Sequence, residues 1–172
     1  VPELTCGATA KAAASARAKS HSVDSEMETL GLDAQKLKAR HDRVWTREQG
    51  TLVNRGTGRP IRAVVPVHVF GQHADMDALN AVCGEFNLPI VEDATESLGS
   101  QYKGRPCGGL GLLGVPSFNG NKIITTGGGG ASVTNAEARA PRAGHRSTAR
   151  SQPTPRARVH ASMAANRRGP NA

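Results

Sequence analysis

Residues 61–93 read IRAVVPVHVFGQHADMDALNAVCGEFNLPIVED, and their apolar side chains follow two different periods. An apolar run at 61–71 ends at Gly71, and a second run at 88–93 ends in two acids. Between the runs, apolar residues recur at the spacing of a helix, at Met76, Leu79, Val82, Cys83 and Phe86. This order of strand, helix and strand predicts a βαβ unit with parallel strands.

The segments around this unit extend the prediction. Asp75 is a suitable N-cap for the helix that follows it. The alanine-rich residues 7–20 are also compatible with a helix, although they show no apolar stripe. Residues 121–134, NKIITTGGGGASVT, predict a strand, a glycine turn and a returning strand. We therefore expect an α/β fold with a mostly parallel sheet flanked by helices.

The net charge of +8 is distributed unevenly along the chain. Residues 1–137 carry equal numbers of basic and acidic side chains, and the excess lies in eight arginines beyond Glu137. That tail has no acid and no aromatic ring on which a base could stack, so nucleic-acid binding is not favoured beyond plain phosphate attraction. We expect one partial domain at 1–139 and a basic, disordered tail at 140–172, where no period is visible.

The composition also indicates the cellular compartment of the protein and the size of its hydrophobic core. No apolar run approaches the roughly 20 residues of a membrane span. The first residues also lack the basic segment followed by an apolar segment that marks a signal peptide. Three cysteines without metal-ligand spacing suggest reduced thiols and no metal site. We expect a cytoplasmic protein without membrane contact. Only five residues are aromatic, which predicts a thin core.

Four residues near the ends of the predicted strands could carry chemistry. Ligands of open α/β sheets bind beyond the carboxyl ends of the strands, where Asp93 and Lys122 are expected, with Ser117 and His68 nearby. A lysine, a carboxylate and a hydroxyl suit pyridoxal phosphate, because the lysine can form a Schiff base and the aspartate can pair with the pyridine nitrogen. Each residue also has a plainer explanation: a solvated lysine, a turn-forming aspartate, a core histidine.

A second glycine pattern points elsewhere. Residues 109–114, GLGLLG, match the dinucleotide motif G-x-G-x-x-G. No strand is predicted before them, Pro116 interrupts any helix after them, and the acid expected about 20 residues further on is missing. The sequence therefore argues against a dinucleotide site.

Longer stretches of the chain resemble a known family. The landmarks are PVHVFG at 66–71, VEDATESLGS at 91–100, YKGRPCGGLG at 102–111 and SFNGNKIITTGGGG at 117–130. They resemble, in order and spacing, the DegT/DnrJ/EryC1/StrS aminotransferases. The residues of these motifs are most similar to the branch that acts in legionaminic-acid-type sugar pathways. The resemblance covers about residues 22–138 and is weaker before and after. It implies a partial large domain of a fold-type I aminotransferase that depends on pyridoxal 5'-phosphate.

The resemblance also implies roles for individual residues. Lys122 would be the catalytic lysine that holds the cofactor and shuttles protons, and Asp93 would pair with the pyridine nitrogen. Glu96 would lie near the phenolic oxygen of the cofactor, at a position where many members of the family have glutamine. Further cofactor contacts would come from Ser117 to the phosphate, from His68 near the ring and from Asn166 to the phosphate of a neighbouring subunit. The glycines at 127–130 would form a turn beside the lysine that leaves room for substrate.

The implied reaction is transfer of an amino group, from glutamate, to a nucleotide-linked 4-keto-6-deoxy sugar by a homodimer. The chain departs from the family in its tail, where most aromatic and acidic positions are alanine or arginine. The family's amino-terminal phosphate-binding loop and its small domain have no counterpart in the sequence. We therefore expect an impaired chain that does not transaminate by itself. The alternatives are an inactive fragment that binds polyanions and a pseudoenzyme that binds only sugar or cofactor.

Overall fold

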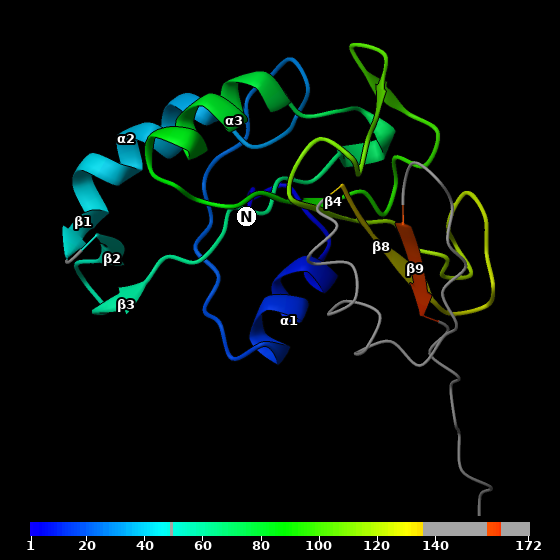
Figure 1. The fold of residues 1–172 in the computed structure, drawn as a ribbon, viewed down its shortest axis with the longest axis horizontal. Helices are drawn as coiled ribbons and strands as arrows, with labels where there is room; N and C mark the ends of the chain where they lie inside the picture. Colours follow the sequence, from blue (N-terminus) through cyan, green and yellow to red (C-terminus); the bar gives the residue numbers. More distant parts are fainter. Residues whose placement is uncertain (49, 136–157, 163–172) are drawn as a thin grey trace, which may run out of the picture.

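The computed structural model of the chain describes residues 1–48, 50–135 and 158–162, the last of these as backbone only. Its helices are α1 (Gly7–Ser15), α2 (Ala34–Val44), the short 3₁₀ turn η1 (Val69–Gly71) and α3 (Met76–Glu85). Helices α2 and α3 lie side by side at the top of Figure 1, and α1 lies below them. The helix expected within residues 7–20 is confirmed, and α2 was not expected from the sequence.

The strands form three sheets. A small antiparallel sheet, not expected from the sequence, contains β1 (Trp45–Glu48), β2 (Thr51–Asn54) and β3 (Arg59–Pro60). The largest sheet has the order β4 (Val91–Asp93), β7 (Leu113–Val115), β8 (Gly130–Thr134) and β9 (Arg158–Ser162). A two-stranded ribbon joins β5 (Gln101–Tyr102) to β6 (Arg105–Pro106). The α/β class is confirmed, and the largest sheet is mixed, since β7 is parallel to β4 but β8 is antiparallel to β7.

The predicted βαβ unit is present, although its first strand is interrupted. Residues 64–68 run parallel to β4: the amide of Val91 donates to Val64 O at 2.9 Å, and that of Asp93 donates to Pro66 O at 2.9 Å. The amide of His68 then donates to Asp93 O at 3.1 Å. Pro66 has no N–H to give, so one hydrogen bond of the ladder cannot form. The segment therefore pairs through two isolated bridges and still delivers His68 beside the end of β4.

Helix α3 is fixed at its start and along one face. The Asp75 carboxylate accepts a hydrogen bond from the amide of Ala78 at 3.1 Å, which confirms the predicted N-cap. The buried residues of the helix are Met76, Leu79, Val82 and Cys83, as their spacing predicted. Helix α2 begins similarly at Asp33, whose side chain accepts from the amides of Gln35 and Lys36.

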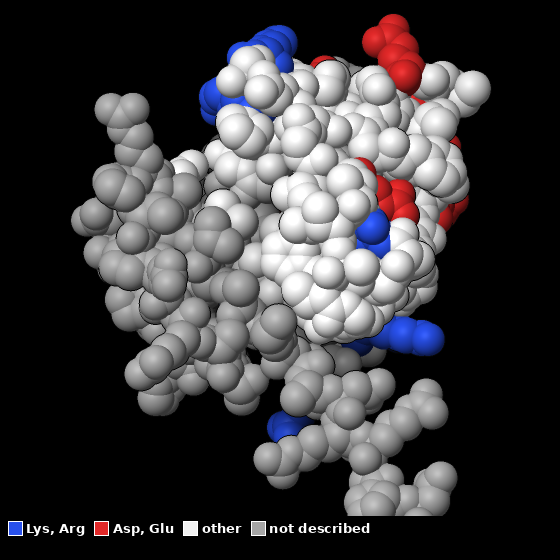
Figure 2. All heavy atoms as spheres, turned by 90° about the vertical axis from the view of Figure 1, so that its right-hand side faces the viewer, with Lys and Arg blue, Asp and Glu red and all other residues white. Residues whose placement is uncertain are grey.

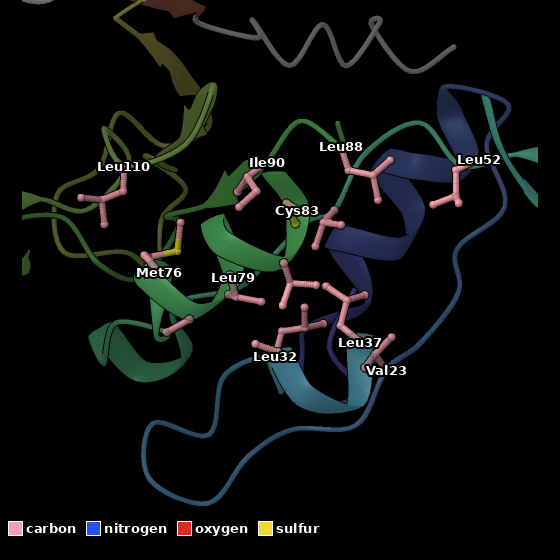
Figure 3. Packing of buried hydrophobic residues seen from close by; sticks show 14 of the residues in the cluster. Val23, Leu32, Leu37, Leu52, Met76, Leu79, Cys83, Leu88, Ile90 and Leu110 are labelled. Atoms are coloured by element: carbon pink, nitrogen blue, oxygen red, sulfur yellow. The ribbon is translucent and has the colours of Figure 1, made fainter. Parts of the chain in front are cut away.

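The core lies where α2 and α3 meet the strands. Figure 3 shows Leu32, Leu37 and Val23 pointing towards Leu79 of α3, with Ile90 and Leu110 on the other side of that helix. Leu79 is fully buried, so truncating it to alanine would cost about 2–5 kcal/mol. This packing fixes α3 against residues 88–93, which holds the end of β4 in place.

Residues 117–129 form a loop, so the strand predicted at 121–125 is wrong. The carbonyl of Phe118 accepts hydrogen bonds from the amide of Thr126 and the hydroxyl of Thr125, which folds the chain back early. Ile123 and Ile124 are exposed, by 63% and 54%, and neither belongs to a sheet within the described residues, so their β-branched side chains gain nothing from sheet packing there. The returning strand after the glycines is confirmed as β8.

The tail differs from the expectation over five residues. Residues 158–162 pair with all five residues of β8 in antiparallel register. The expectation rested on the missing side-chain period, whereas sheet pairing uses backbone groups, and residues 158–162 contain no proline. The rest of the predicted tail, 140–157 and 163–172, lies outside the described residues. None of the helices in the described ranges has the length and hydrophobicity that a membrane crossing requires.

Candidate functional site

The carboxyl end of β4 carries two adjacent acids with different surroundings. Glu92 is completely buried, and Asp93 is half-buried. Successive side chains of a strand point to opposite faces, so the two carboxylates face different parts of the molecule. The sequence singled out Asp93 and gave no role to Glu92.

Glu92 holds a hydrogen-bond network inside the protein. Its Oε2 lies 3.0 Å from Nε2 of His68 and accepts from the amide of Gly108 at 2.7 Å. Its Oε1 accepts from the amides of Leu110, at 2.6 Å, and Gly111. Burial alone would raise the pKa of Glu92, but the hydrogen bonds from His68 and the amides of Gly111 and Gly108 outweigh it, and the pKa lies below its usual value. Glu92 is therefore an ionised carboxylate, and the groups described as donating hydrogen bonds to it all belong to the protein itself.

This network also decides the state of His68. Nδ1 of the imidazole accepts a hydrogen bond from the amide of Ala74 at 3.2 Å, so it carries no proton. Nε2 must then hold the hydrogen and donate it to Glu92. Both ring nitrogens have partners, and the side chain is fully buried. This geometry is that of a core histidine, and contact with a cofactor ring stays a prediction.

The G-x-G-x-x-G match at 109–114 finds its explanation here. The amides that surround Glu92 belong to residues 108–111, so the loop binds the protein's own carboxylate. The approach is close, because a Cβ on Gly114 would lie 2.0 Å from the carbonyl oxygen of Gly108. Gly108 itself has a φ of +87°, which disfavours any other residue. The glycines thus serve the contact between this loop and β7.

Asp93 has a lighter set of partners on its own face. Its Oδ2 accepts the hydroxyl hydrogen of Thr9 at 2.6 Å, and its Oδ1 accepts from the amide of Thr95 at 3.2 Å. Thr9 lies in α1, and its hydroxyl is 2.9 Å from that of Thr5. The sequence reasoning missed both threonines: Thr5 precedes α1 and Thr9 lies in its first turn.

Lys122 and Glu96 form the one ion pair that the structure describes in this region. Nζ of Lys122 lies 3.1 Å from Oε1 of Glu96, and the lysine side chain is 16% exposed. The second oxygen of Glu96 accepts from the amide of Phe70 at 3.0 Å. The hydrogen bond from Lys122 is the main cause that lowers the pKa of Glu96 below its usual value. Phe70 has a φ of +53°, a strained conformation for a bulky residue, and its ring is 80% exposed.

The predicted site residues are thus only partly brought together. Asp93 is the last residue of β4, Glu96 lies in the turn that follows, and Glu96 connects this turn to Lys122 in the loop 117–129. Within the described residues, no hydrogen bond or ion pair joins Asp93 to Lys122. Ser117 lies in the same loop, where its hydroxyl accepts from the amide of Asn119 at 3.3 Å. Asn166 lies outside the described residues.

The glycines that follow Lys122 have local reasons for their identity. Gly127 and Gly129 have φ angles of +81° and +153°, which side chains rarely tolerate. A Cβ on Gly130 would lie 2.9 Å from the carbonyl oxygen of Pro116, where the loop closes. The space that they would leave for a substrate stays a prediction.

The residues present fit pyridoxal phosphate by their chemistry. A mostly buried lysine amine can attack an aldehyde, and a carboxylate can accept from a protonated ring nitrogen. Asp93 retains acceptor capacity, because each carboxylate oxygen has two lone pairs and accepts from only one donor among the described residues. In the described part of the chain, no three His, Cys, Asp or Glu side chains are grouped as metal ligands.

Comparisons with known proteins agree with this chemistry. The sequence profile of the DegT/DnrJ/EryC1/StrS aminotransferase family matches residues 1–167. The putative pyridoxal phosphate-dependent aminotransferase EpsN of Bacillus subtilis is 52% identical over 77 residues, which are 45% of this chain and 20% of that protein. GDP-perosamine synthase of Caulobacter vibrioides is 40% identical over 135 residues, which are 78% of this chain and 32% of that protein.

A solved structure extends the match to the fold. The crystal structure of a DegT DnrJ EryC1 StrS aminotransferase from Brucella abortus superposes with a TM-score of 0.71 at 25% identity. It covers 94% of this chain, which corresponds to 42% of that protein. The chain spans between a fifth and a third of the length of the two curated relatives. The resemblance to the legionaminic-acid-type branch stays a prediction.

Proposed function

This chain belongs to the DegT/DnrJ/EryC1/StrS aminotransferase family, whose members use pyridoxal 5'-phosphate, and we propose that it forms part of an enzyme that aminates a nucleotide-linked sugar. The proposed acceptor is a 4-keto-6-deoxy sugar, and the proposed amino donor is glutamate. The name of the Caulobacter relative, GDP-perosamine synthase, supports a nucleotide sugar. Since the chain spans at most a third of the curated relatives reported above, the proposal concerns the activity of the whole protein.

The observation that carries the proposal is the position of the Lys122 amine. Its side chain is mostly buried, it lies 3.1 Å from Glu96, and Glu96 lies in the turn that follows Asp93 at the carboxyl end of β4. The other lysines with described ion pairs, Lys36, Lys38 and Lys103, are about half exposed or more and pair with surface acids. Lys122 is thus set apart from these three by burial and by its place at the ligand-binding end of the sheet.

When bound, pyridoxal phosphate supplies an aldehyde for a lysine and a ring that accepts electrons. We propose that Nζ of Lys122 would hold the cofactor and, once the amino donor has released it, would move a proton from the donor carbon that bears the amino group to the aldehyde carbon of the cofactor. The carboxylate of Asp93 would accept from the protonated ring nitrogen through a free lone pair. Thr9 would orient that carboxylate through its 2.6 Å hydrogen bond.

Glu96 has a proposed role in positioning the lysine. Its carboxylate accepts a hydrogen bond from Nζ of Lys122 at 3.1 Å, and the amide of Phe70 holds its other oxygen in place. Glu96 would therefore keep the Lys122 amine near the end of β4 until a ligand displaces the pair.

The remaining predicted contacts complete the proposal. Ser117 would bind the cofactor phosphate with its hydroxyl, since it lies in the same loop as Lys122. His68 would act on the site indirectly. Its imidazole is hydrogen-bonded to Glu92, and Glu92 precedes Asp93 in β4. Asn166 would reach the phosphate of a neighbouring subunit.

We propose that the whole protein is a homodimer that works in the cytoplasm. Exposed apolar side chains lie beside the Lys122–Glu96 pair: Phe70, Ile123 and Ile124. Figure 2 views the molecule from the right-hand side of Figure 1, and most of the described surface on this face is uncharged. The three exposed apolar side chains suit contact with a second copy of the chain. The free thiols of the described Cys6, Cys83 and Cys107 suit a reducing compartment. Sedimentation showing only monomers at micromolar concentration would contradict the dimer.

The test of the lysine is chemical labelling. The chain is mixed with pyridoxal phosphate, reduced with borohydride, digested and mapped by mass spectrometry. We expect the label at Lys122, together with a visible absorption band before reduction that Lys122→Ala abolishes. An even spread of label over Lys36, Lys38 and Lys103 would overturn the proposed role.

A matched variant separates a lost attachment point from a lost positive charge. Lys122→Arg keeps the charge beside Glu96 but cannot form the bond, so it should also lose the band. Lys38→Arg, in an exposed pair with Glu85, should leave the band unchanged. Turnover of the whole enzyme is then measured with glutamate and a panel of nucleotide-linked keto sugars.

A further inference from the structure

The loop that carries Lys122 also contains Asn119–Gly120, the one place in the chain where asparagine precedes glycine. Both residues are exposed, and the loop runs along the right-hand edge of the molecule in Figure 1. An asparagine side chain can be attacked by the backbone nitrogen of the next residue, and glycine leaves that nitrogen uncovered because it has no side chain. The proposed reaction uses neither residue, so the pair is a separate chemical feature of the loop.

The described structure gives no conformational reason for glycine at position 120. Its φ angle lies outside the left-handed region, in contrast to the φ of +81° at Gly127. Among the described residues, a Cβ on Gly120 would touch only the carbonyl oxygen of Gly127, at 3.9 Å, which is an ordinary contact. The turn and its packing would therefore accept alanine, and what glycine changes here is the reactivity of its nitrogen.

The groups that would react lie on one exposed turn. The amide of Lys122 donates to Asn119 O at 3.0 Å, which closes the turn. Nδ2 of Asn119 donates to Oδ1 of Asn121 at 2.9 Å, so the side chain extends forward along the chain, past Gly120. The Gly120 nitrogen donates to no acceptor among the described residues. This nitrogen is thus unprotected, and the side chain that it would attack extends in its direction.

Asn54 shows how the fold protects an asparagine. It is 2% exposed, its Oδ1 accepts from the amides of Gly56 and Thr57, and an arginine follows it. These hydrogen bonds fix the side chain, and the arginine side chain restricts the approach to the next backbone nitrogen. Asn119 has neither protection, so the two asparagines should react at very different rates.

We propose that Asn119–Gly120 is a site of spontaneous deamidation that alters the turn in front of Lys122. Hydroxide removes the proton of the Gly120 amide, and the nitrogen attacks Cγ of Asn119 to form a new C–N bond. The side-chain nitrogen leaves as ammonia after taking a proton from water, which regenerates the hydroxide. Water then opens the cyclic imide at one of its two carbonyls. The products are aspartate and isoaspartate, and no oxidant or reductant is required.

The isoaspartate product changes the position of Lys122, a consequence that rests on the proposed role of this lysine. In that product the backbone runs through the former side chain, which adds one carbon to the main chain, and the former carbonyl of Asn119 becomes part of a free carboxylate. That carbonyl is the acceptor that closes the turn onto the amide of Lys122. We therefore expect Lys122 to lose its fixed place beside Glu96 and to attach less pyridoxal phosphate.

The test follows the full chain by mass spectrometry during storage at pH 6 and at pH 8. After digestion, fragment ions should place the mass difference between NH₂ and OH at Asn119, with a faster increase at pH 8 because hydroxide starts the reaction. Isoaspartate is told apart from aspartate by protein L-isoaspartyl methyltransferase, which methylates only isoaspartate. Asn54 and Asn121 are internal controls, one buried and one followed by lysine. No change at Asn119, or equal rates at Asn119 and Asn121, would overturn the proposal.

Two matched variants separate the neighbouring glycine from the loop as a whole. Gly120→Ala should slow the reaction at Asn119 about tenfold, which corresponds to about 1.4 kcal/mol of activation free energy, because the methyl group covers the attacking nitrogen. Gly128→Ala makes the same change in the same loop, at a position where a Cβ has open space, and should leave the rate unchanged. Equal rates in the two variants would overturn the assignment.

Labelling of a stored sample with pyridoxal phosphate and borohydride tests the consequence for Lys122. A protease that cuts after glutamate leaves Asn119 and Lys122 on one peptide, so a single spectrum shows both changes. We expect the label on the unaltered peptide and little label on the isoaspartate form. Equal labelling of the two forms would overturn the effect on Lys122. A fresh chain that takes no label at Lys122 would overturn the proposed role of the lysine, whereas the deamidation is decided by the mass change alone.

Discussion

Glu92 and Asp93 are neighbours on one strand, yet the structure uses them in opposite ways. Glu92 is fully buried and bonded to His68 and the loop 108–111, whereas Asp93 is half-buried, and each of its oxygens accepts from one donor among the described residues. The first carboxylate is committed to the fold, and the second has capacity left for a ligand. Acid residues at a strand end are therefore not equivalent, because the alternation of side chains sends one inwards and one to the site.

The largest expected effect is that of Glu92→Gln on stability. The glutamine side chain replaces one acceptor oxygen with an NH₂ donor. In one orientation this donor faces the amides of Leu110 and Gly111, and in the other it faces the amide of Gly108 and the N–H of His68. We expect a loss of about 2–6 kcal/mol in the free energy of unfolding, because two buried donors lose their acceptor and each costs roughly 1–3 kcal/mol. Urea denaturation at pH 7 measures it. A loss below about 1 kcal/mol would remove the distinction between the two acids.

Asp93→Asn should do the reverse. It retains an acceptor for Thr9 or for the amide of Thr95, so the cost in stability should be about 1 kcal/mol. In the whole enzyme, the rate should fall about 10²-fold or more, since the partner of the ring nitrogen loses its charge. Urea denaturation and turnover are measured on the same preparation. A stability loss as large as that of Glu92→Gln would contradict the division of roles.

The smallest effect is expected in the acid dependence of stability. The pKa values of Glu92 and Glu96 lie below the usual 4.5 in the folded chain. Both carboxylates therefore stabilise the fold above about pH 4.5, and this contribution disappears as the pH falls through their lower folded values. Glu96 is 36% exposed, so its pair with Lys122 should contribute at most about 1 kcal/mol.

Urea midpoints between pH 7 and pH 3 would separate the two glutamates. Glu96→Gln should remove a small part of the decline in stability, and Glu92→Gln should remove more of it. If Glu96→Gln reduced the pH dependence of the urea midpoint as much as Glu92→Gln, the expected difference between a half-exposed and a buried acid would be contradicted.

Local signals in the sequence determined the elements whose stability comes from neighbouring residues. Asp75 and the apolar spacing of residues 76–86 predicted α3 and its buried face, and the run at 88–93 predicted β4. The order of strand, helix and strand then indicated an α/β fold, and the motifs indicated the family. These predictions hold because a cap bond or a helical stripe involves residues within a few positions of each other.

Only the tertiary structure decided the elements that depend on distant partners. Residues 121–125 have the composition of a strand but lack one, because Phe118 closes the loop and no strand among the described residues pairs with the isoleucines. Residues 158–162 have no strand period, yet they pair with β8. A strand requires a neighbour, and the neighbour is not written in the strand's own sequence.

The site shows the same division between local and distant information. The sequence marked Lys122, Asp93 and Glu96 through their motifs, but it could not show that Thr9 bonds to Asp93 across 84 positions or that Glu96 meets Lys122 across 26. It also could not separate Glu92 from Asp93, and it left open whether His68 lies in the core or near a cofactor. Those outcomes depend on which groups folding brings within about 3 Å, and that distance is set by the packing of α3, β4 and the loop 108–111 together.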